Sequence, residues 1–232
     1  MKKIITILSL VLCLITTAFT QAGPQSIWAS VTSSGATASE VEVIEVKEAS
    51  SGNIYVLVQS NDGTNDIVQL IKYNAVGVEQ FSQTYASTAY ERPIGMGLDN
   101  SENIYIVTDR GINNAKVLKY NSAGNLQWSY MYGGAITLIE PRAMLVNEAT
   151  GDVYFTGSYE NMTNSENENV MLAKLNSAGI SQWISYFNSS IDGEDIGYSI
   201  VKDNSDNIYV GAKIYSSPIV LKFNASGTQQ WQ

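Results

Sequence analysis

Short apolar runs, separated by clusters of Gly, Asn, Asp and Ser, recur along the chain from about residue 40 onward. In the runs that begin N-I-Y or D-V-Y, at residues 53–58, 103–107, 152–156 and 207–212, apolar residues follow one another instead of alternating with polar ones. Successive apolar residues indicate strands that are buried on both faces. No run shows the 3.6-residue period of a helix, so the pattern predicts short β-strands in an antiparallel meander.

The same order of residues occurs four times along the chain. Each copy has a tyrosine in the N-I-Y or D-V-Y run, then a lysine before an N-x-x-G turn, the turn glycine, and an aromatic residue shortly after it. The members are Tyr55, Lys72, Gly77 and Phe81; Tyr105, Lys119, Gly124 and Trp128; Tyr154, Lys174, Gly179 and Trp183; and Tyr209, Lys222, Gly227 and Trp231. Equivalent positions lie about 50 residues apart, which is typical of propeller blades.

We therefore predict an all-β fold, a β-propeller of four blades that are each a four-stranded antiparallel sheet. The units are predicted at approximately residues 40–85, 91–132, 140–187 and 195–232. The residues around Trp28 resemble those around Trp128, and they occupy the same place in the repeat as those around Trp231. Both cannot complete one blade, so we expect an incomplete ring or a fragment of a longer propeller.

The N-terminus is predicted to be a secretory signal peptide over residues 1–22, followed by the propeller domain at residues 23–232. Lys2 and Lys3 precede an apolar run from Ile4 to Ile15, which is too short to span a membrane as a helix. The only cysteine, Cys13, lies in this run. We expect a secreted protein, extracellular or at the cell surface, without membrane insertion.

Charge and composition exclude several classes of function. The net charge is -9, which makes nucleic acid an unfavourable partner. The chain has no histidine, so histidine-dependent triads and histidine-ligated zinc sites are excluded. Without Cys13 the mature protein would also lack thiols, and any catalysis would depend on carboxylates, Tyr, Ser, Thr or Lys.

The last unit carries a family resemblance. The segments G-E-D-I-G-Y-S-I-V-K-D-N-S-D-N-I-Y-V-G-A, residues 193–212, and I-V-L-K-F-N-A-S-G-T-Q-Q-W, residues 219–231, resemble the SBBP-type β-propeller repeat of secreted bacterial proteins. Residues 151–157 and 174–183 form the second-best copy. The resemblance implies a non-catalytic binding or scaffold module, with a protein or glycan as partner and no cofactor. Quinoprotein propellers also have repeats ending in G-x-x-x-W, but the chain shows no additional cofactor-binding set.

An acidic residue recurs twelve positions before the Asn or Asp of the N-I-Y slot: Glu91, Glu140 and Asp195. In a propeller this position lies at the entry to the innermost strand, near the mouth of the central channel. Converging carboxylates there would bind Ca²⁺, or two of them would act as acid and base on a glycan. The alternative is structural, with the carboxylates capping turn amides or pairing with Arg92 and Arg142.

Three further features have structural explanations. The repeated lysines are expected to lay their aliphatic stems on the blade and keep their ammonium groups in water. The acidic segments 99–103 and 203–207 are predicted as turns and not as calcium loops, because they lack the glycine and the distal glutamate of an EF-hand. Small residues such as Gly95, Gly97 and Gly197 suit inner strands that are crowded near the axis.

Overall fold

The computed structural model describes residues 40–61, 63–87, 90–111, 114–163, 168–189 and 193–232. The strands of the first half are β1 (Glu40–Glu48), β2 (Ile54–Asn61), β3 (Asp66–Tyr73), β4 (Glu79–Ser87), β5 (Arg92–Leu98), β6 (Ile104–Asp109), β7 (Asn114–Tyr120) and β8 (Leu126–Gly133). Those of the second half are β9 (Thr137–Asn147), β10 (Asp152–Asn161), β11 (Asn169–Leu175), β12 (Ser181–Phe187), β13 (Asp195–Lys202), β14 (Ile208–Ile214), β15 (Ser217–Phe223) and β16 (Gln229–Trp231). The predicted signal peptide and the predicted strand around Trp28 lie outside the described residues.

Consecutive strands pair in sets of four. The sheets have the orders β1-β2-β3-β4, β5-β6-β7-β8, β9-β10-β11-β12 and β13-β14-β15-β16, and every pairing is antiparallel. The prediction of four four-stranded antiparallel blades is confirmed, and we number them blades 1 to 4. Among the described residues, no helix has the length and apolar character needed to cross a membrane.

The third and fourth strands of each blade are joined by the N-x-x-G turn. In blade 2 the Asn121 side chain accepts hydrogen bonds from the backbone N–H of Ala123, at 3.1 Å, and of Asn125, at 2.9 Å. Gly124 then takes a φ of 80°, a conformation that strains any residue with a side chain. The repeated Asn and Gly of the sequence are therefore the two residues that this hairpin requires.

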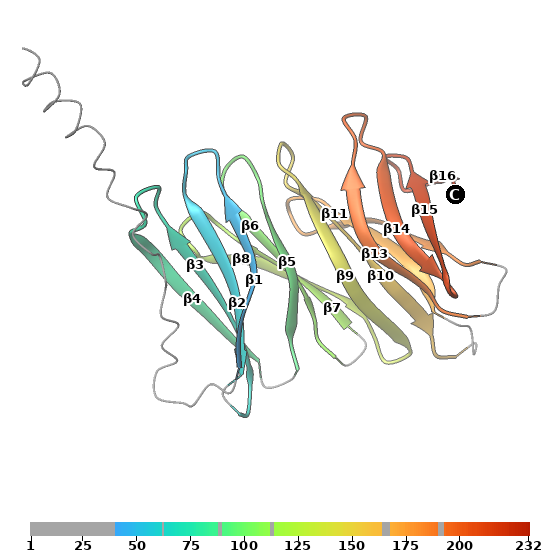
Figure 1. Cartoon of the computed structure of the whole chain (residues 1–232), viewed down its shortest axis with the longest axis horizontal. Helices are drawn as coiled ribbons and strands as arrows, with labels where there is room; N and C mark the ends of the chain where they lie inside the picture. Colours follow the sequence, from blue (N-terminus) through green and yellow to red (C-terminus); the bar gives the residue numbers. More distant parts are fainter. Residues whose placement is uncertain (1–39, 62, 88–89, 112–113, 164–167, 190–192) are drawn as a thin grey trace, which may run out of the picture. The chain divides into compact units, whose positions relative to one another are not determined.

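The first strands of the blades lie next to one another. Strand β5 contacts β1 and β9, and β9 contacts β13 (Figure 1). A methyl group added at Gly97 of β5 would overlap Val146 of β9, and one at Gly197 of β13 would overlap Thr156 of β10. The small residues on the inner strands permit this close approach, as the sequence predicts.

Three hydrophobic clusters hold the blades together. Each lies between two neighbours: Leu57 and Leu70 with Ile104 and Leu118, Tyr105 and Val117 with Phe155 and Met171, and Tyr154 and Leu172 with Val210 and Leu221. No comparable cluster of described residues joins blade 4 to blade 1, and these blades lie at opposite ends of the row of sheets (Figure 1). The described blades thus form an open propeller, one of the two arrangements that the sequence predicts.

Each boundary between blades, which we call a joint, repeats a set of side-chain contacts. The aromatic residue of one blade covers the turn glycine of the next blade. A Cβ added at Gly179 of blade 3 would lie 2.7 Å from the Trp128 ring of blade 2. Lys119 and Trp128 of blade 2 also donate hydrogen bonds to the backbone oxygen of Ser177, at 3.0 and 3.1 Å. The repeated aromatic residues therefore fill the space between blades.

The prediction that the repeated lysines keep their ammonium groups in water is wrong for blades 1 to 3. Lys119 Nζ bonds the turn of the next blade, and Lys174 Nζ lies 2.9 Å from an Asp152 carboxylate oxygen. Each Nζ also lies near the tyrosine ring of its own blade, 5.0 Å from the Tyr105 centroid in blade 2. The periodicity of one unit does not reveal that its lysine faces a carbonyl of the next unit.

Candidate functional site

Glu91 is the most enclosed of the predicted site carboxylates. Its side chain is fully buried just before β5, where Thr108 Oγ1 donates a 2.9 Å hydrogen bond to its Oε1. Lys116 Nζ lies 3.7 Å from Oε1, and Arg110 Nε lies 3.5 Å from Oε2 without hydrogen-bond geometry. Tyr85 of blade 1 covers Lys116, with its ring centroid 4.1 Å from Nζ. The carboxylate is thus neutralised by two cations of its own blade.

The other two carboxylates have partners of their own. Glu140 Oε2 lies 2.5 Å from Arg142 Nη2, and both side chains are about one-third exposed. Asp195 is buried and accepts hydrogen bonds from the backbone N–H and the hydroxyl of Ser189, at 2.6 and 3.1 Å. Asp195 therefore ties the end of blade 3 to the start of blade 4.

The predicted site residues are thus distributed over separate contacts. Arg92 does not pair with Glu91; its Nη2 lies 3.9 Å from Asp109. Among the described residues, no three acidic side chains lie close enough together to hold a metal ion. Burial raises the pKa of Glu168, and the nearby carboxylates of Glu140 and Glu194 raise it further.

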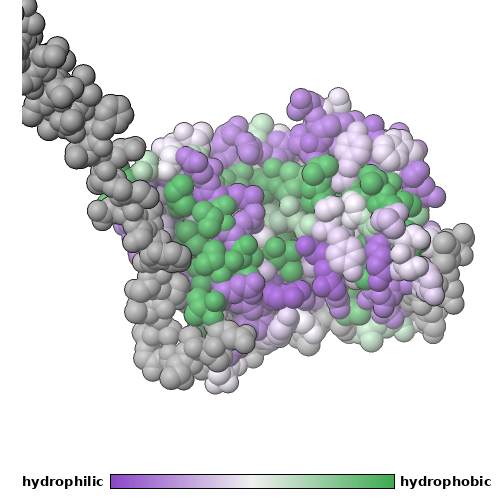
Figure 2. Space-filling view, viewed as in Figure 1, coloured by the Kyte–Doolittle hydropathy of each residue, from purple (hydrophilic) through white to green (hydrophobic). Residues whose placement is uncertain are grey.

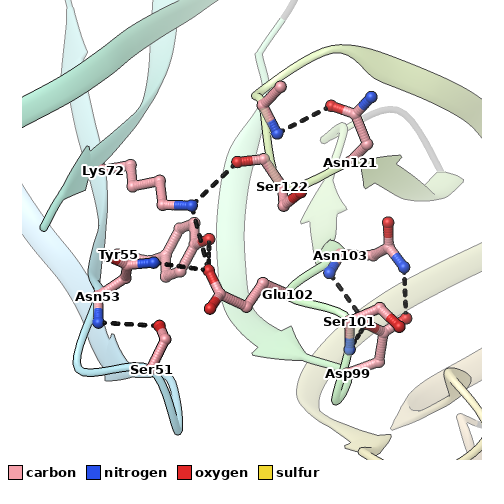
Figure 3. Close-up of polar contacts among 11 residues, drawn as sticks. Ser51, Asn53, Tyr55, Lys72, Asp99, Ser101, Glu102, Asn103, Asn121 and Ser122 are labelled. Atoms are coloured by element: carbon pink, nitrogen blue, oxygen red, sulfur yellow. Dashed lines mark hydrogen bonds and ion pairs between the residues drawn. The ribbon is translucent and has the colours of Figure 1, made fainter.

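A carboxylate that the sequence analysis does not single out, Glu102, is the centre of the joint between blades 1 and 2. Its Oε2 accepts hydrogen bonds from Asn53 Nδ2 at 3.0 Å, Tyr55 OH at 2.6 Å and Lys72 Nζ at 3.1 Å (Figure 3). Lys72 also donates to the backbone oxygen of Ser122, at 3.1 Å. Three side chains of blade 1 thereby converge on one oxygen of blade 2.

These contacts decide the ionisation of the site. Burial alone would raise the Glu102 pKa, but hydrogen bonds from Ser51, Tyr55, Asn53 and Lys72 outweigh it and lower the pKa to about 2. Burial, together with the hydrogen bond to Glu102, raises the pKa of Tyr55. The carboxylate therefore stays ionised and the phenol stays protonated across the neutral pH range.

The sequence does contain a feature that indicates the role of Glu102 as a hydrogen-bond acceptor for Tyr55. Blades 2 and 4 have an aspartate at the start of the turn after the first strand, and it accepts the hydrogen bond of the blade's own tyrosine, at 2.9 Å from Asp99 to Tyr105 and 3.0 Å from Asp203 to Tyr209. Blade 1 has Ala49 at the corresponding position. Its tyrosine therefore finds an acceptor in the next blade.

Glu102 and Asp206 occupy the same position of their turns, with φ of 57° and 60°. We expect Glu102→Gly to lower the free energy of unfolding by about 2 kcal/mol, because charged hydrogen bonds are lost, partly offset by relief of the left-handed conformation. Asp206 accepts one hydrogen bond, from Lys202 Nζ at 2.6 Å, but its side chain is half exposed, so Asp206→Gly should change the stability by less than about 1 kcal/mol. Urea denaturation of both variants measures the difference, and an equal loss in both would contradict the role of Glu102.

The Glu102 carboxylate is also expected to make the stability of the protein depend on pH. The pKa of Glu102 is lowered from 4.5 to about 2, so its contribution to stability is fully present above about pH 4.5 and is lost as the pH falls toward 2. The difference in stability between the parent protein and Glu102→Gly should therefore shrink over this range.

A groove lies where the inner strands of blades 1 to 3 end. It has a volume of about 270 Å³, and its lining residues are Lys47, Glu48, Met96, Gly97, Leu98, Met144, Leu145, Val146 and Glu148. Hydrophobic side chains gather on the face of the molecule that carries β1 and β5 (Figure 2). The groove combines apolar residues of β5 and β9, among them the half-buried Met144 and the buried Met96, with charged residues of β1 and with Glu148, which follows β9.

A second pocket lies between blades 3 and 4. It has a volume of about 380 Å³, and its lining residues are Phe187, Asn188, Ser189, Ile214, Ser217, Pro218, Ile219 and Gln232. Ser189 is the residue that bonds Asp195, so this predicted site residue lies behind the pocket wall. Four of the eight lining residues are apolar, Phe187, Ile214, Pro218 and Ile219, so the pocket offers both apolar and polar contacts.

Comparison with known proteins adds no assignment to these residues. No family model matches the sequence, and no curated protein matches it. The chain is similar to a protein of unknown function from Bacteroides caccae, with a TM-score of 0.38 and 10% identity over 84% of this chain and 82% of that one. It is also similar to prolyl oligopeptidase B from Galerina marginata, with a TM-score of 0.46 and 10% identity over 81% of this chain. The match covers 24% of the length of that peptidase.

Proposed function

We propose that this protein is a non-catalytic binding module, a secreted propeller of the SBBP type whose inner groove binds an extended segment of another protein. The observation that carries the proposal is the groove at the ends of β1, β5 and β9, which is lined by Met144, Leu98 and Leu145 and by charged residues from two blades. The open, concave side of inner strands is where a propeller offers side chains from several blades to one ligand.

The chemistry of the groove favours a peptide over a sugar. Methionine side chains are flexible and polarizable, so they adapt to apolar side chains of different shapes. Sugar sites usually present aromatic faces, and none of the residues lining this groove is aromatic. Lys47 and Glu48 on the side of blade 1 and Glu148 on the side of blade 3 would bind charged groups along the peptide.

The partners of the predicted carboxylates argue against the carbohydrate-active enzyme. A glycosidase needs two carboxyl groups about 5–10 Å apart that both face the substrate. Glu91 and Asp195 are buried with their own partners, and Glu140 is paired with Arg142. None of the three offers a carboxyl group to a cleft that it shares with another.

The proposal is tested by selecting peptides that bind the full chain from a display library and measuring their affinities by calorimetry. Met144→Gln places a polar group of similar size in the groove, and it should weaken binding about 10-fold, which corresponds to about 1.4 kcal/mol. Met162→Gln is the matched control, because Met162 is 55% exposed and is not among the groove residues.

Two results would contradict the proposal. One is selected peptides that bind Met144→Gln as tightly as the parent protein. The other is hydrolysis of a glycan that disappears in Glu140→Gln, which would favour the enzyme. The same preparations, screened on a glycan array and by thermal shift with Ca²⁺, show whether a sugar or calcium stabilises the fold by binding to it.

A further inference from the structure

The joint between blades 2 and 3 contains a group of four tyrosines. Tyr130 and Tyr132 lie on β8 of blade 2, and Tyr159 and Tyr186 lie on β10 and β12 of blade 3. The ring centroids are 4.8 Å apart in the pair on blade 2 and 4.4 Å apart in the pair on blade 3. Tyr130, Tyr132 and Tyr159 pack in the hydrophobic cluster between these two blades. We call the four residues the tyrosine cluster.

The repeat itself does not require two of these tyrosines. At the position of Tyr130, two residues after the repeated aromatic residue, blade 1 has Gln83 and blade 3 has Ser185. At the position of Tyr186, three residues after the repeated aromatic residue, blades 1 and 2 have a threonine and a methionine. Closing a joint therefore needs no tyrosine at either position, and the cluster is a property of this joint alone.

The blade 3 half of the cluster presents an aromatic ring to solvent. Tyr159 is the register partner of Asn169, and Tyr186 is the register partner of Met171, so these four side chains share one face of the blade. The Tyr159 and Tyr186 rings are tilted by 39°. Tyr186 is 48% exposed, whereas Tyr159 is half-buried. Tyr159 thus supports the Tyr186 ring and leaves part of its surface accessible.

Polar groups on the same face lack partners within the described structure. Asn169 is only 5% exposed, yet its side-chain amide makes no hydrogen bond with a described residue. The same holds for the hydroxyl groups of Tyr130, Tyr159 and Tyr186, whereas Tyr132 OH donates a 3.0 Å hydrogen bond to Ser181 Oγ. Buried polar groups are usually hydrogen-bonded, so the free Asn169 amide favours a ligand that hydrogen-bonds to it.

The face is also uncharged. Glu160 follows Tyr159 in β10, so its side chain points to the opposite face of the blade. Glu168 lies near Glu160 and near Glu194 of blade 4. Burial and the neighbouring Tyr159 raise the pKa of Tyr186, so its phenol stays protonated at neutral pH. A ligand of this face therefore needs no charge.

We propose that the tyrosine cluster and Asn169 bind an uncharged sugar ring. The apolar C–H face of the sugar packs on the exposed part of the Tyr186 ring. Its hydroxyl groups bond the Asn169 amide and the free phenol hydroxyls, which both donate and accept hydrogen bonds. None of these residues lines the groove of blades 1 to 3, so sugar binding here does not depend on peptide binding there.

An array of immobilised neutral and anionic oligosaccharides, probed with the full chain, tests the proposal. We expect binding to neutral oligosaccharides. Tyr186→Ala should weaken the affinity, measured by calorimetry with the bound oligosaccharide in solution, at least about 10-fold. Tyr198→Ala is the matched control, because Tyr198 is 50% exposed on β13, outside the cluster, and its loss should leave the affinity unchanged.

Two further variants separate stacking from hydrogen bonding. Tyr186→Phe retains the ring and should weaken binding less than about 3-fold, whereas Asn169→Leu has a similar volume without the amide and should weaken it about 10-fold. Thermal unfolding of each variant verifies that it folds.

Several results overturn the proposal. They are an array on which no neutral oligosaccharide binds, binding to anionic oligosaccharides alone, and a folded Tyr186→Ala protein that binds as tightly as the parent. An equal loss in Tyr198→Ala overturns it as well. So does a Tyr186→Ala protein that loses affinity for selected peptides and not for sugars, because the cluster would then belong to a protein interface.

Discussion

Replacing Glu91 by alanine is expected to lower the free energy of unfolding by about 3–5 kcal/mol. The fully buried Glu91 carboxylate lies 3.7 Å from Lys116 Nζ and 3.5 Å from Arg110 Nε. Lys116 is itself only 8% exposed, so removing the carboxylate leaves a buried cation without its counter-charge. Urea denaturation followed by tryptophan fluorescence measures the loss.

Glu140→Ala is the control for this prediction. It removes the same side chain from the same point of the next blade, but the Glu140–Arg142 pair is about one-third exposed, and exposed ion pairs contribute at most about 1 kcal/mol. Equal losses in the two variants would show that burial does not decide the contribution of Glu91. A larger loss for Glu140→Ala would contradict the structural role assigned here.

Gly157→Ala is expected to lower the free energy of unfolding by about 3 kcal/mol. Gly157 lies in β10, at the point where the pairing of β9 and β10 shifts register. A Cβ at this position would overlap the backbone oxygen of Glu140 and lie 2.8 Å from the Cα of Pro141. Backbone atoms cannot move aside as a flexible side chain can, so the two strands would have to separate.

The matched control is Gly134→Ala, where the nearest atom to an added Cβ is 4.0 Å away. The same change of residue there should alter the stability by less than about 1 kcal/mol. Thermal unfolding of both variants, monitored by circular dichroism, gives the comparison. A Gly157→Ala protein as stable as Gly134→Ala would mean that the inner strands are less tightly packed than the structure indicates.

The fold could be predicted from the sequence because the evidence for it is repeated. One N-I-Y-V run is ambiguous, but four tyrosines at a spacing of about 50 residues, each followed by Lys, N-x-x-G and an aromatic residue, indicate four equal sheets. Each turn also needs its Asn and Gly for local reasons, and this placed the hairpins correctly.

The candidate site was less predictable, because its contacts join different units. The recurring position of Glu91 and Asp195 could be read from the sequence, but the cations beside Glu91 come from the β6–β7 hairpin. Arg92, the neighbour in sequence, pairs elsewhere. The role of Glu102 depends on a missing aspartate in the preceding blade, which is visible only after both units are aligned and known to touch.

The use of backbone oxygens in the joints affects which amino-acid substitutions the turns can accept during evolution. Lys72 and Lys119 bond the carbonyls of Ser122 and Ser177 and not their side chains, so the residue at that turn position is free to drift. Each unit carries its own tyrosine, lysine and aromatic residue and its own N-x-x-G turn. Duplication or loss of a gene segment encoding one blade would therefore preserve these backbone contacts, whereas the joint between blades 1 and 2 also needs Glu102 as the acceptor for Tyr55.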